Sequence, residues 1–345
     1  MKKTLLRILI LVLIMSMVGV FSLIGCKAEA APSEEAAEEV VAEEVVAEEE
    51  VVAEGAKEFT IGVANFVLTA PYFLAMSDAV VEEAAYFTNI TVLTTDAGGD
   101  AAKMTSDIED MIAKGADGII TNAGPIEALP AGLDAIKAAG IPVVMLDRKL
   151  TGGDYTSWMG PDNYQIGVQD GEYLIDRLGG EGFLLIICGG PADNTIGLDR
   201  TNGVISVVEN SNIEYVMAPD FGNWSEDGGF TVMEDMLAKY DKIDVVFCEN
   251  DSMALGAQKA IEDAGRSEEM FLCGVDGQKE ALKAIMDDTN FACTGKNDSD
   301  EIGRAGFYRL MAILAGAIPE KDSVLDSPKI TIENAAQYYN PDSLF

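Results

Sequence analysis

The sequence predicts an α/β protein made of two doubly wound parallel-sheet domains that are connected by a hinge of three chain crossings. Three observations lead to this fold class. Short β-branched runs alternate with longer stretches whose apolar residues recur at helical spacing, and this alternation occurs in two successive series. The chain also has 345 residues, too many for one ordinary core, and 48% of them are hydrophobic, enough to fill two.

The first series contains four expected strands and three expected helices. The strands are Phe59–Asn65, Ile90–Thr95, Asp117–Asn122 and Pro142–Leu146. The helices are Tyr72–Phe87, Ala101–Lys114 and Ile126–Ala139. Glycines fall in the turns between them. This order favours βα units and a parallel sheet covered on both faces.

A second series repeats the pattern. Its strands are expected at Phe183–Cys188, Glu214–Ala218, Val245–Cys248 and Met270–Val275. Its helices are expected at Gln165–Leu178, Ile196–Glu209, Glu226–Tyr240 and Met253–Ala264. Three late elements follow, the strand Phe291–Gly295, the helix Ser299–Leu314 and a last strand near Ile330–Ile332.

The crossings between the two halves are expected near Gly160-Pro161-Asp162, Asn297-Asp298 and Ser327-Pro328. They divide the folded part into an N-terminal lobe of residues 57–161 and 298–327 and a C-terminal lobe of residues 162–297 and 328–345. Two α/β halves joined by short crossings imply a cleft between them, where the carboxyl ends of the strands meet.

The first 26 residues form a predicted leader. Lys2, Lys3 and Arg7 give it a basic start, and an apolar run follows from Ile8 to Ile24. The run is long enough to be marginal for a membrane span. It ends in Leu23-Ile24-Gly25-Cys26, which resembles the bacterial lipobox, where the cysteine is diacylated and becomes the new N-terminus. The resemblance implies a lipid anchor on Cys26 that attaches the mature protein to the membrane.

Residues 27–58 are strongly acidic, with twelve Glu and two Lys, and the near-repeat Glu-Glu-Val-Val-Ala occurs at 38–42, 43–47 and 49–53. A coiled-coil or amphipathic helix is one interpretation. The repeat of five to six residues fits neither helical period, so we favour a disordered, self-repelling tether that holds the folded part away from the membrane.

Charge and composition exclude several function classes. The formal net charge is −36, and loss of the three basic leader residues leaves 20 basic against 59 acidic residues, or −39. Such a surface repels nucleic acid, and no basic cluster counters it. The chain has no His and no close Cys-x-x-Cys, so we predict no metal site and no other cofactor. Cys188, Cys248, Cys273 and Cys293 are compatible with disulfides or with buried thiols.

Polar and aromatic residues follow the predicted strands in a distinctive order. They are Pro71-Tyr72-Phe73, Leu146-Asp147-Arg148, Asp199-Arg200, Glu249-Asn250-Asp251-Ser252-Met253-Ala254-Leu255-Gly256-Ala257 and Gly274-Val275-Asp276-Gly277. Here the chain resembles the periplasmic binding proteins (type I fold) of the ribose and galactose/glucose group, from about Phe59 to the last strand. The resemblance implies an extracytoplasmic, monomeric protein, not an enzyme, that closes over a pentose or hexose and delivers it to an ABC-type permease.

The resemblance also implies a set of ligand contacts. The family's aromatic pair falls on Tyr72 and Phe73, its Asp-Arg pair on Asp147 and Arg148, its second-domain arginine on Arg200, its opposing aromatic on Trp224, its strand-end amide and carboxylate on Asn250 and Asp276, and its hinge contact on Asn297. Two positions depart from the ribose-binding pattern. Ala70 stands where those proteins carry Asn, and Phe66 stands where a small polar residue is common. The chain also lacks the calcium loop of some galactose binders, so the hydroxyl pattern of the ligand stays open.

Elementary chemistry agrees with such a ligand, since aromatic rings cover the C–H face of a sugar and charged or amide groups pair with its hydroxyls. Simpler alternatives remain for individual residues. Asp147 and Arg148 are also compatible with a surface ion pair, Trp224 with an inter-helix contact, and Asn250 with a helix cap. Glu249 and Asp193 are further candidates near the site.

Other functions remain as alternatives. A sensor lipoprotein, or a binder of a non-sugar polyol or furanone, would use the same fold. A glycoside-acting enzyme is disfavoured, because the chain has no His and because Asp147 and Asp276 are expected beside Arg or Asn, which favours permanently ionised carboxylates over an acid/base pair.

Overall fold

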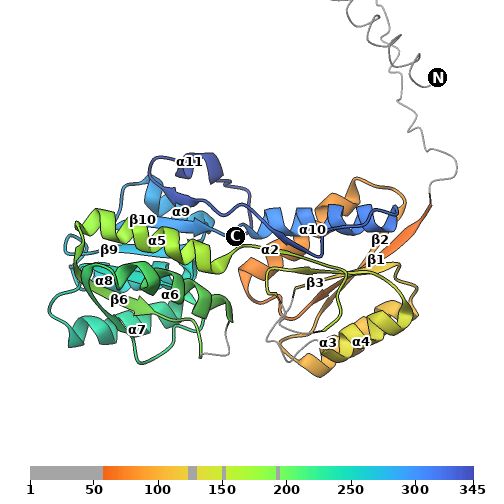
Figure 1. Ribbon diagram of the computed structural model, residues 1–345, viewed down its shortest axis with the longest axis horizontal. Coiled ribbons are helices and arrows are strands. Elements are labelled where there is room, and N and C mark those ends of the chain that lie inside the picture. The colour runs from red at the N-terminus through yellow and green to blue at the C-terminus, as the bar shows by residue number, and fades with distance from the viewer. Residues whose placement is uncertain (1–56, 123–129, 150–152, 192–194) are drawn as a thin grey trace, which may run out of the picture. The chain divides into compact units, whose positions relative to one another are not determined.

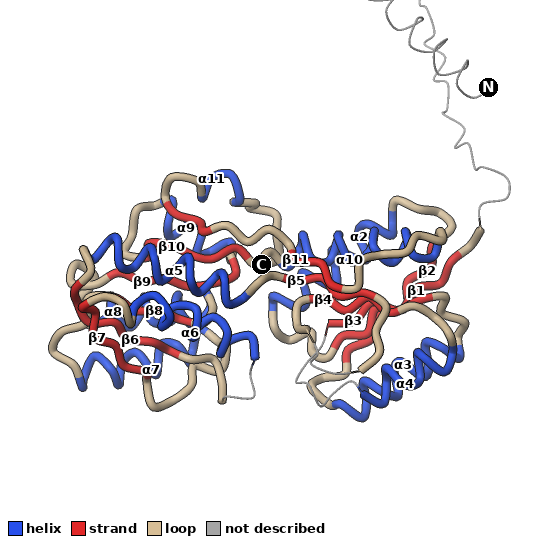
Figure 2. Tube along the Cα trace, in the orientation of Figure 1, coloured by secondary structure: helices blue, strands red, loops and turns tan. Residues whose placement is uncertain are grey.

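The computed structural model describes residues 57–122, 130–149, 153–191 and 195–345. The predicted leader, Cys26, almost all of the tether, residues 126–129 of one predicted helix and Asp193 lie outside these ranges. The described residues form one unit that contains two six-stranded sheets (Figures 1 and 2). None of the described helices is long and apolar enough to cross a membrane.

The first sheet has the strand order β11-β5-β4-β3-β1-β2, and its strands pair in parallel. Their bounds are β1 (Phe59–Asn65), β2 (Ile90–Asp96), β3 (Gly118–Asn122), β4 (Val143–Leu146), β5 (Ser157–Gly160) and β11 (Asp322–Val324). The helices α3 (Ala101–Ala113) and α4 (Pro130–Ala139) pack on one face through residues such as Ile108 and Ile136. The helices α2 (Pro71–Ala85) and α10 (Ser299–Leu314) pack on the other through Val80 and Phe307. We call this sheet and its helices the first lobe.

The second sheet has the order β12-β10-β9-β8-β6-β7. Its strands are β6 (Glu181–Ile187), β7 (Asn212–Met217), β8 (Val245–Cys248), β9 (Phe271–Asp276), β10 (Phe291–Lys296) and β12 (Lys329–Thr331), and β12 alone runs antiparallel to its neighbour. Two helices, α5 (Asn163–Leu178) and α6 (Thr195–Val208), pack on one face. Three more, α7 (Glu226–Lys239), α8 (Asp251–Asp263) and α9 (Lys279–Met286), pack on the other. With α11 (Ala335–Tyr338), these elements form the second lobe.

Helices on both faces explain why the strands read as continuous hydrophobic runs. β3, β4, β8 and β9 are buried along their whole length, so neither set of alternate side chains faces water. The predicted fold class, two parallel-sheet α/β domains, is confirmed.

Four short elements were not predicted, namely β5, β11, α9 and α11. β5 has the sequence Ser-Trp-Met-Gly and contains no β-branched residue, and β11 and α11 are only three and four residues long. Neither hydrophobic alternation nor helical periodicity can be detected over such lengths. The predicted helix Ile126–Ala139 corresponds to α4, whose described part begins at Pro130.

In the described ranges the chain passes between the sheets three times, from β5 to α5, from β10 to α10 and from β11 to β12. The passages are tied to one another by hydrogen bonds. Lys296 N donates to Pro328 O at 3.0 Å, and Leu325 N donates to Gly160 O at 2.9 Å. The side chain of Gln169 on α5 bonds Ser327 O and Lys329 N. The connection between the lobes is therefore a narrow bundle of three short segments.

Candidate ligand-binding site

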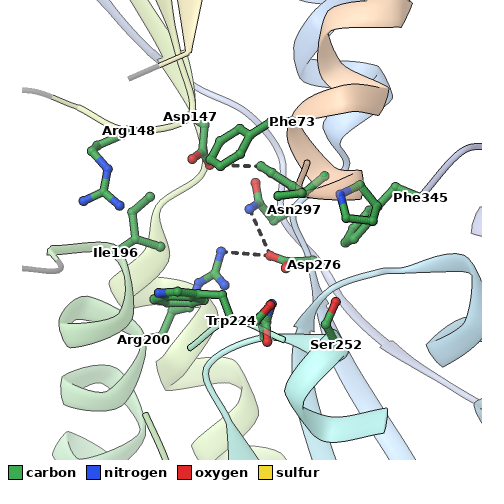
Figure 3. Close-up of a pocket in the computed structure, with 14 residues that line it drawn as sticks. Phe73, Asp147, Arg148, Ile196, Arg200, Trp224, Ser252, Asp276, Asn297 and Phe345 are labelled. Carbon is green, nitrogen blue, oxygen red and sulfur yellow. Dashed lines mark hydrogen bonds and ion pairs between the residues drawn. The ribbon is translucent and has the colours of Figure 1, made fainter. Parts of the chain in front are cut away.

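A cavity of about 620 Å³, counted out to its open mouth, lies between the two lobes at the carboxyl ends of the strands (Figure 3). All nine residues that the sequence predicted as ligand contacts line it: Tyr72, Phe73, Asp147, Arg148, Arg200, Trp224, Asn250, Asp276 and Asn297. Five more residues complete the lining: Ala70, Pro71, Ile196, Ser252 and Phe345.

The start of α2 supplies the aromatic wall of the first lobe. Pro71 is the first helical residue, a position that suits its fixed φ and missing N–H. Tyr72 and Phe73 follow at once, with their rings edge to face at 5.4 Å, and both line the cavity. Burial, followed by the charges of Asp147 and Asp276, raises the pKa of Tyr72 well above its usual value. The phenol thus stays protonated and donates a hydrogen bond to Asp147 Oδ1 at 2.9 Å.

Asp147 follows β4 in a left-handed conformation, with φ 63°, and is 3% exposed. Its backbone is fixed from two sides, because its N–H donates to Met159 O at 2.9 Å and its carbonyl accepts from Trp158 Nε1 at 3.1 Å. Gly160 leaves the space for this carbonyl, since a Cβ at Gly160 would lie 2.6 Å from it. The adjacent Arg148 is half-buried and also lines the cavity. The predicted Asp-Arg pair is therefore part of the cavity wall and not a free surface pair.

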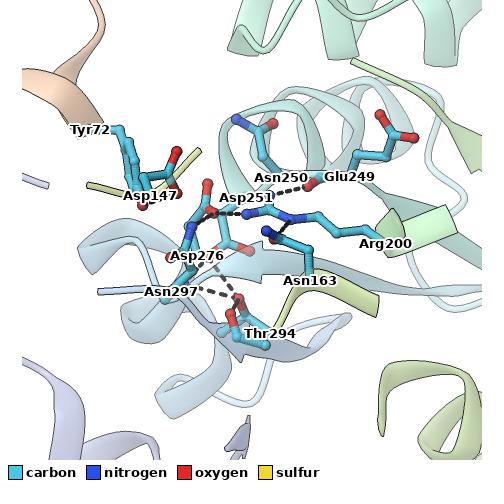
Figure 4. Close-up of polar contacts among 12 residues, drawn as sticks. Tyr72, Asp147, Asn163, Arg200, Glu249, Asn250, Asp251, Asp276, Thr294 and Asn297 are labelled. Carbon is cyan, nitrogen blue, oxygen red and sulfur yellow. Dashed lines mark hydrogen bonds and ion pairs between the residues drawn. The ribbon is translucent and has the colours of Figure 1, made fainter. Parts of the chain in front are cut away.

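Arg200, on α6, holds the centre of the second lobe's wall (Figure 4). Its guanidinium donates from Nε to Asn163 Oδ1 at 2.8 Å and from Nη1 to Glu249 O at 2.6 Å, and its Nη2 lies 3.0 Å from Asp276 Oδ1. Burial alone would lower the pKa of Arg200, but Asp276, Asp147 and other neighbours outweigh it and raise that pKa above its usual value. Arg200 thus presents a fixed positive charge that is only 2% exposed.

Asp276, at the end of β9, is the partner of Arg200 and also accepts from Asn297 Nδ2 at 3.1 Å. Burial raises the pKa of Asp276 to about 6, although Arg200 and Asn297 oppose the shift. The expectation of a permanently ionised carboxylate is therefore wrong at mildly acidic pH, because desolvation exceeds the stabilisation by its partners. Asn297 Oδ1 is buried and has no hydrogen-bond partner among the described residues.

Asp251 stabilises the backbone that follows Asp276. Its Oδ2 accepts from Gly277 N and Gln278 N, both at 2.8 Å, and from Thr294 Oγ1 at 2.9 Å. These bonds hold the turn after Asp276, whose own φ of 128° is unusual for a residue with a side chain. Burial raises the pKa of Asp251 to about 7. Asp251 thus positions the cavity-lining carboxylate of Asp276 without lining the cavity itself.

Trp224 provides the aromatic surface of the second lobe. It has φ 59°, which is rare for a bulky residue, and its ring lies so close to Gly189 that a Cβ there would meet it at 2.3 Å. Asn250 Nδ2 donates to Trp224 O at 3.4 Å, while Asn250 Oδ1 accepts from Met253 N at 3.0 Å. Asn250 is therefore a helix cap that also lines the cavity.

Backbone strain is concentrated at this site. Of the five described non-glycine residues with positive φ, three line the cavity: Asp147, Trp224 and Asp276. Such conformations cost roughly 1–3 kcal/mol each and persist where surrounding structure enforces them, which is common at binding sites. The folded chain thus maintains unfavourable backbone geometry to aim these three side chains.

Glu249, a further candidate from the sequence, faces away from the cavity. Its carboxylate accepts from Gly189 N at 2.6 Å and from Thr201 Oγ1 at 2.7 Å, and only its carbonyl reaches Arg200. Phe66 packs against the first lobe's core instead of lining the cavity. Sequence reasoning missed Ile196 and Phe345 as lining residues. Ile196 lies one turn before Arg200 on the same helix, which could have indicated it, but Phe345 lies far from any strand end.

The described residues include no group of His, Cys, Asp or Glu suited to hold a metal ion. Cys188, Cys248, Cys273 and Cys293 are free thiols here. Cys273 and Cys293 are direct neighbours on β9 and β10, with their Sγ atoms 2.8 Å apart.

Two α/β lobes with a cavity at their strand ends define the solute-binding class of protein. The chain belongs to the periplasmic binding protein domain family, whose model matches residues 61–318. It is 31% identical over 265 residues to the ribose import binding protein of Bacillus subtilis, covering 77% of this chain and 85% of that protein. It is 27% identical to the xylitol-binding protein of Mycolicibacterium smegmatis, covering 79% of this chain and 77% of that protein. A Bacillus halodurans ABC transporter solute-binding protein with bound myo-inositol superposes with a TM-score of 0.75 at 26% identity, covering 83% of this chain and 98% of that one.

Proposed function

We propose that this protein captures a monosaccharide or a closely related small polyol outside the cytoplasm and delivers it to an ABC-type permease. The observation that supports this most strongly is the composition of the cavity wall. Flat rings of Tyr72, Phe73 and Trp224 stand beside an Arg200–Asp276 ion pair and two amides. Rings cover the C–H face of a sugar, while charged and amide groups pair with its hydroxyls.

The burial of the charges supports a hydroxylated ligand in particular. Arg200 and Asp276 are 2% and 5% exposed, and Asp147 is 3% exposed. A purely apolar ligand would seal these groups from water without replacing the lost hydrogen bonds, at a cost of about 1–3 kcal/mol for each unsatisfied group. A polyol supplies both donors and acceptors, and a missing hydroxyl would leave a buried group unpaired, which gives specificity.

Ligand capture by hinge closure follows from the three connecting segments. Because the chain passes between the lobes through three short segments in the described ranges, one lobe can rotate relative to the other, and a ligand that contacts both favours the closed arrangement. Two bodies are proposed to move relative to one another. One is the first, N-terminal lobe of residues 57–161 and 298–327, and the other is the second, C-terminal lobe of residues 162–297 and 328–345. The permease would recognise the closed form.

A binding role without catalysis is part of this proposal. The Asp276 carboxylate already bonds Arg200 and Asn297, and Asp147 accepts from Tyr72. Each carboxylate is thus engaged in holding the wall, while a glycoside hydrolase needs one free acid and one free base or nucleophile. The relatives named above are solute-binding proteins.

Attachment to the membrane through Cys26, with residues 27–58 as the tether, is proposed on the sequence pattern, and the protein is proposed to act as a monomer. The anchor has a direct test. Cys26→Ala removes the thiol that would carry the lipid and should abolish labelling of the protein by a fatty-acid probe in the expressing bacterium. Labelling of that variant at the wild-type level would contradict the lipid anchor.

The ligand is identified by a thermal-shift screen of the purified protein against pentoses, hexoses, inositols and linear polyols, followed by calorimetry on each hit. A ligand that binds only the folded state raises the melting temperature, by an amount that grows with concentration above Kd. We expect at least one member to bind with one-to-one stoichiometry and no chemical change. The absence of binding across the panel, or the formation of a product, would overturn the proposed function.

A further inference from the structure

We infer that Phe345 determines the size of the ligand, because its ring separates the cavity from a second, polar cavity beside it. This inference rests on the proposed function and concerns the same site. Phe345 and Asp276 each line both cavities, and of the two only Phe345 contributes an apolar ring to the boundary. The second measures about 460 Å³ and is lined by polar and charged residues that include Lys279, Asp298 and Arg304.

The segment that ends in Phe345 returns to the site from the second lobe. After β12 and α11 the chain turns back, and its end lies between the two lobes (Figure 1). In Figure 3 Phe345 stands on the opposite side of the cavity from Arg148 and Ile196. Its apolar ring is therefore an end wall, distinct from the charged groups between the two lobes.

Ser343 anchors this segment to both lobes. Its carbonyl accepts from Lys279 Nζ at 2.5 Å, at the start of α9 in the second lobe. Its hydroxyl donates to Asp300 Oδ2 at 2.9 Å, in the first turn of α10 in the first lobe. Phe345 N in turn lies 3.2 Å from Ser343 Oγ. The segment is thus held beside the passage from β10 to α10, next to Asn297.

The ring itself is specifically seated. Phe345 is 7% exposed, while the neighbouring Leu344 is 53% exposed. The Phe345 ring meets the Tyr72 ring edge to face, with centroids 5.3 Å apart, and Tyr72 donates to Asp147. Such aromatic pairs stabilise beyond their buried area. Phe345 therefore contributes a wall and also supports the ring that positions a ligand-facing carboxylate.

Loss of the ring would join the two cavities. A ligand extended by one hydroxymethyl group, which the wild-type wall excludes, would then reach into the polar space near Lys279 and Arg304. The ligand that fits the wild-type cavity would lose its end contact and the support of Tyr72. Phe345→Ala should thus weaken the first ligand and reduce the discrimination against the second.

The test is calorimetry on wild type, Phe345→Ala, Phe345→Leu and Leu344→Ala, with the panel ligand that wild type binds best and its homologue that carries one more hydroxymethyl group. We expect Phe345→Ala to weaken the first ligand about tenfold and to reduce the ratio of the two affinities about tenfold or more. Phe345→Leu keeps most of the bulk and should give an intermediate ratio, and Leu344→Ala should match wild type.

Circular dichroism and melting temperature establish whether each variant is folded. If Phe345→Ala is not folded, the affinities of Phe345→Leu are compared with those of the wild type instead. If the folded variant leaves the ratio of the two ligand affinities unchanged, Phe345 does not determine ligand size. That result would leave the proposed function intact. A wild-type protein that binds nothing in the panel would contradict the proposed function, and this inference with it.

Discussion

The position of the Trp224 ring depends on Gly189, which does not itself line the cavity. Gly189 follows β6 closely, and a Cβ there would lie 2.3 Å from the indole ring. Gly189→Ala must therefore displace the ring, and we expect it to weaken ligand binding about as much as Trp224→Ala, roughly tenfold or more. In the double variant the added methyl group meets no ring, so the two effects should not add.

Calorimetry on the two single variants and the double variant checks this prediction. Phe221→Ala is the matched control, since Phe221 lies in the same loop, is 41% exposed and does not line the cavity. Full additivity in the double variant would show that Gly189 acts by another route. Unchanged affinity in Trp224→Ala, with the fold intact, would mean that the opposing wall is misassigned.

We expect Asp276 to make ligand binding depend on pH. Burial raises its pKa to about 6, so the carboxyl is mostly protonated at pH 5. Ligand hydroxyls that donate to it favour the ionised form, so binding should release a proton and affinity should rise with pH. A site that requires the ionised form binds about tenfold more weakly at pH 5 than above pH 7.

Calorimetry at pH 6 in buffers of different ionisation enthalpy measures the released proton. Arg200, Asp147, Asp251 and Tyr72 are charged or titratable neighbours of Asp276, and Asp251, with a pKa of about 7, titrates in the same range. Asp276→Asn removes one titration and keeps that of Asp251. If this variant retains the whole pH dependence of the wild type, Asp276 is not the responsible group.

At the scale of elements, the close packing of α7 on α8 places Asn250 and Trp224 side by side. Gly256 on α8 allows this contact, because a Cβ there would lie 1.9 Å from Glu226 O. Gly256→Ala should reduce the free energy of unfolding by about 1–3 kcal/mol, since neither backbone can yield easily. Glu262→Ala, at an exposed position on the same helix, should change it by less than about 0.5 kcal/mol.

Denaturant unfolding of both variants measures the difference. Equal stability of Gly256→Ala and wild type would show that the two helices have room to separate, and that their contact does not set the position of the wall.

Some strands and site residues could be predicted from the sequence, and others could not. Strands such as β4 and β8 were predictable because unbroken hydrophobic runs between turns are typical of sheets covered on both faces. Residues after those strands could be placed together because parallel strands end at one edge. β5 has no β-branched residue, and Phe345 reaches the cavity through a tail contact with Tyr72, so no local pattern marked either of them.

Geometry within the site was equally beyond the sequence. Nothing in the order of residues shows that Glu249 turns toward Gly189 and Thr201, or that Asp251 holds the turn after Asp276. Both carboxylates have the composition of a ligand contact, and only the hydrogen bonds of the folded chain reveal that they position other groups.

We expect the whole molecule to become more compact when a ligand binds. Because the lobes are joined by three short segments, saturating ligand should reduce the radius of gyration measured by small-angle X-ray scattering. A sugar from the panel that does not bind is the control and should leave the curve unchanged. An identical radius of gyration with and without bound ligand would contradict hinge closure.

We propose above that rings and paired charges from both lobes surround one small polyol. A crystal structure of the protein grown with the best ligand of the panel tests it most directly. We expect the ligand in the cavity between the lobes, with its hydroxyls within hydrogen-bond distance of Arg200 and Asp276 and its C–H face against Trp224. A ligand bound elsewhere, with these side chains untouched, would contradict it.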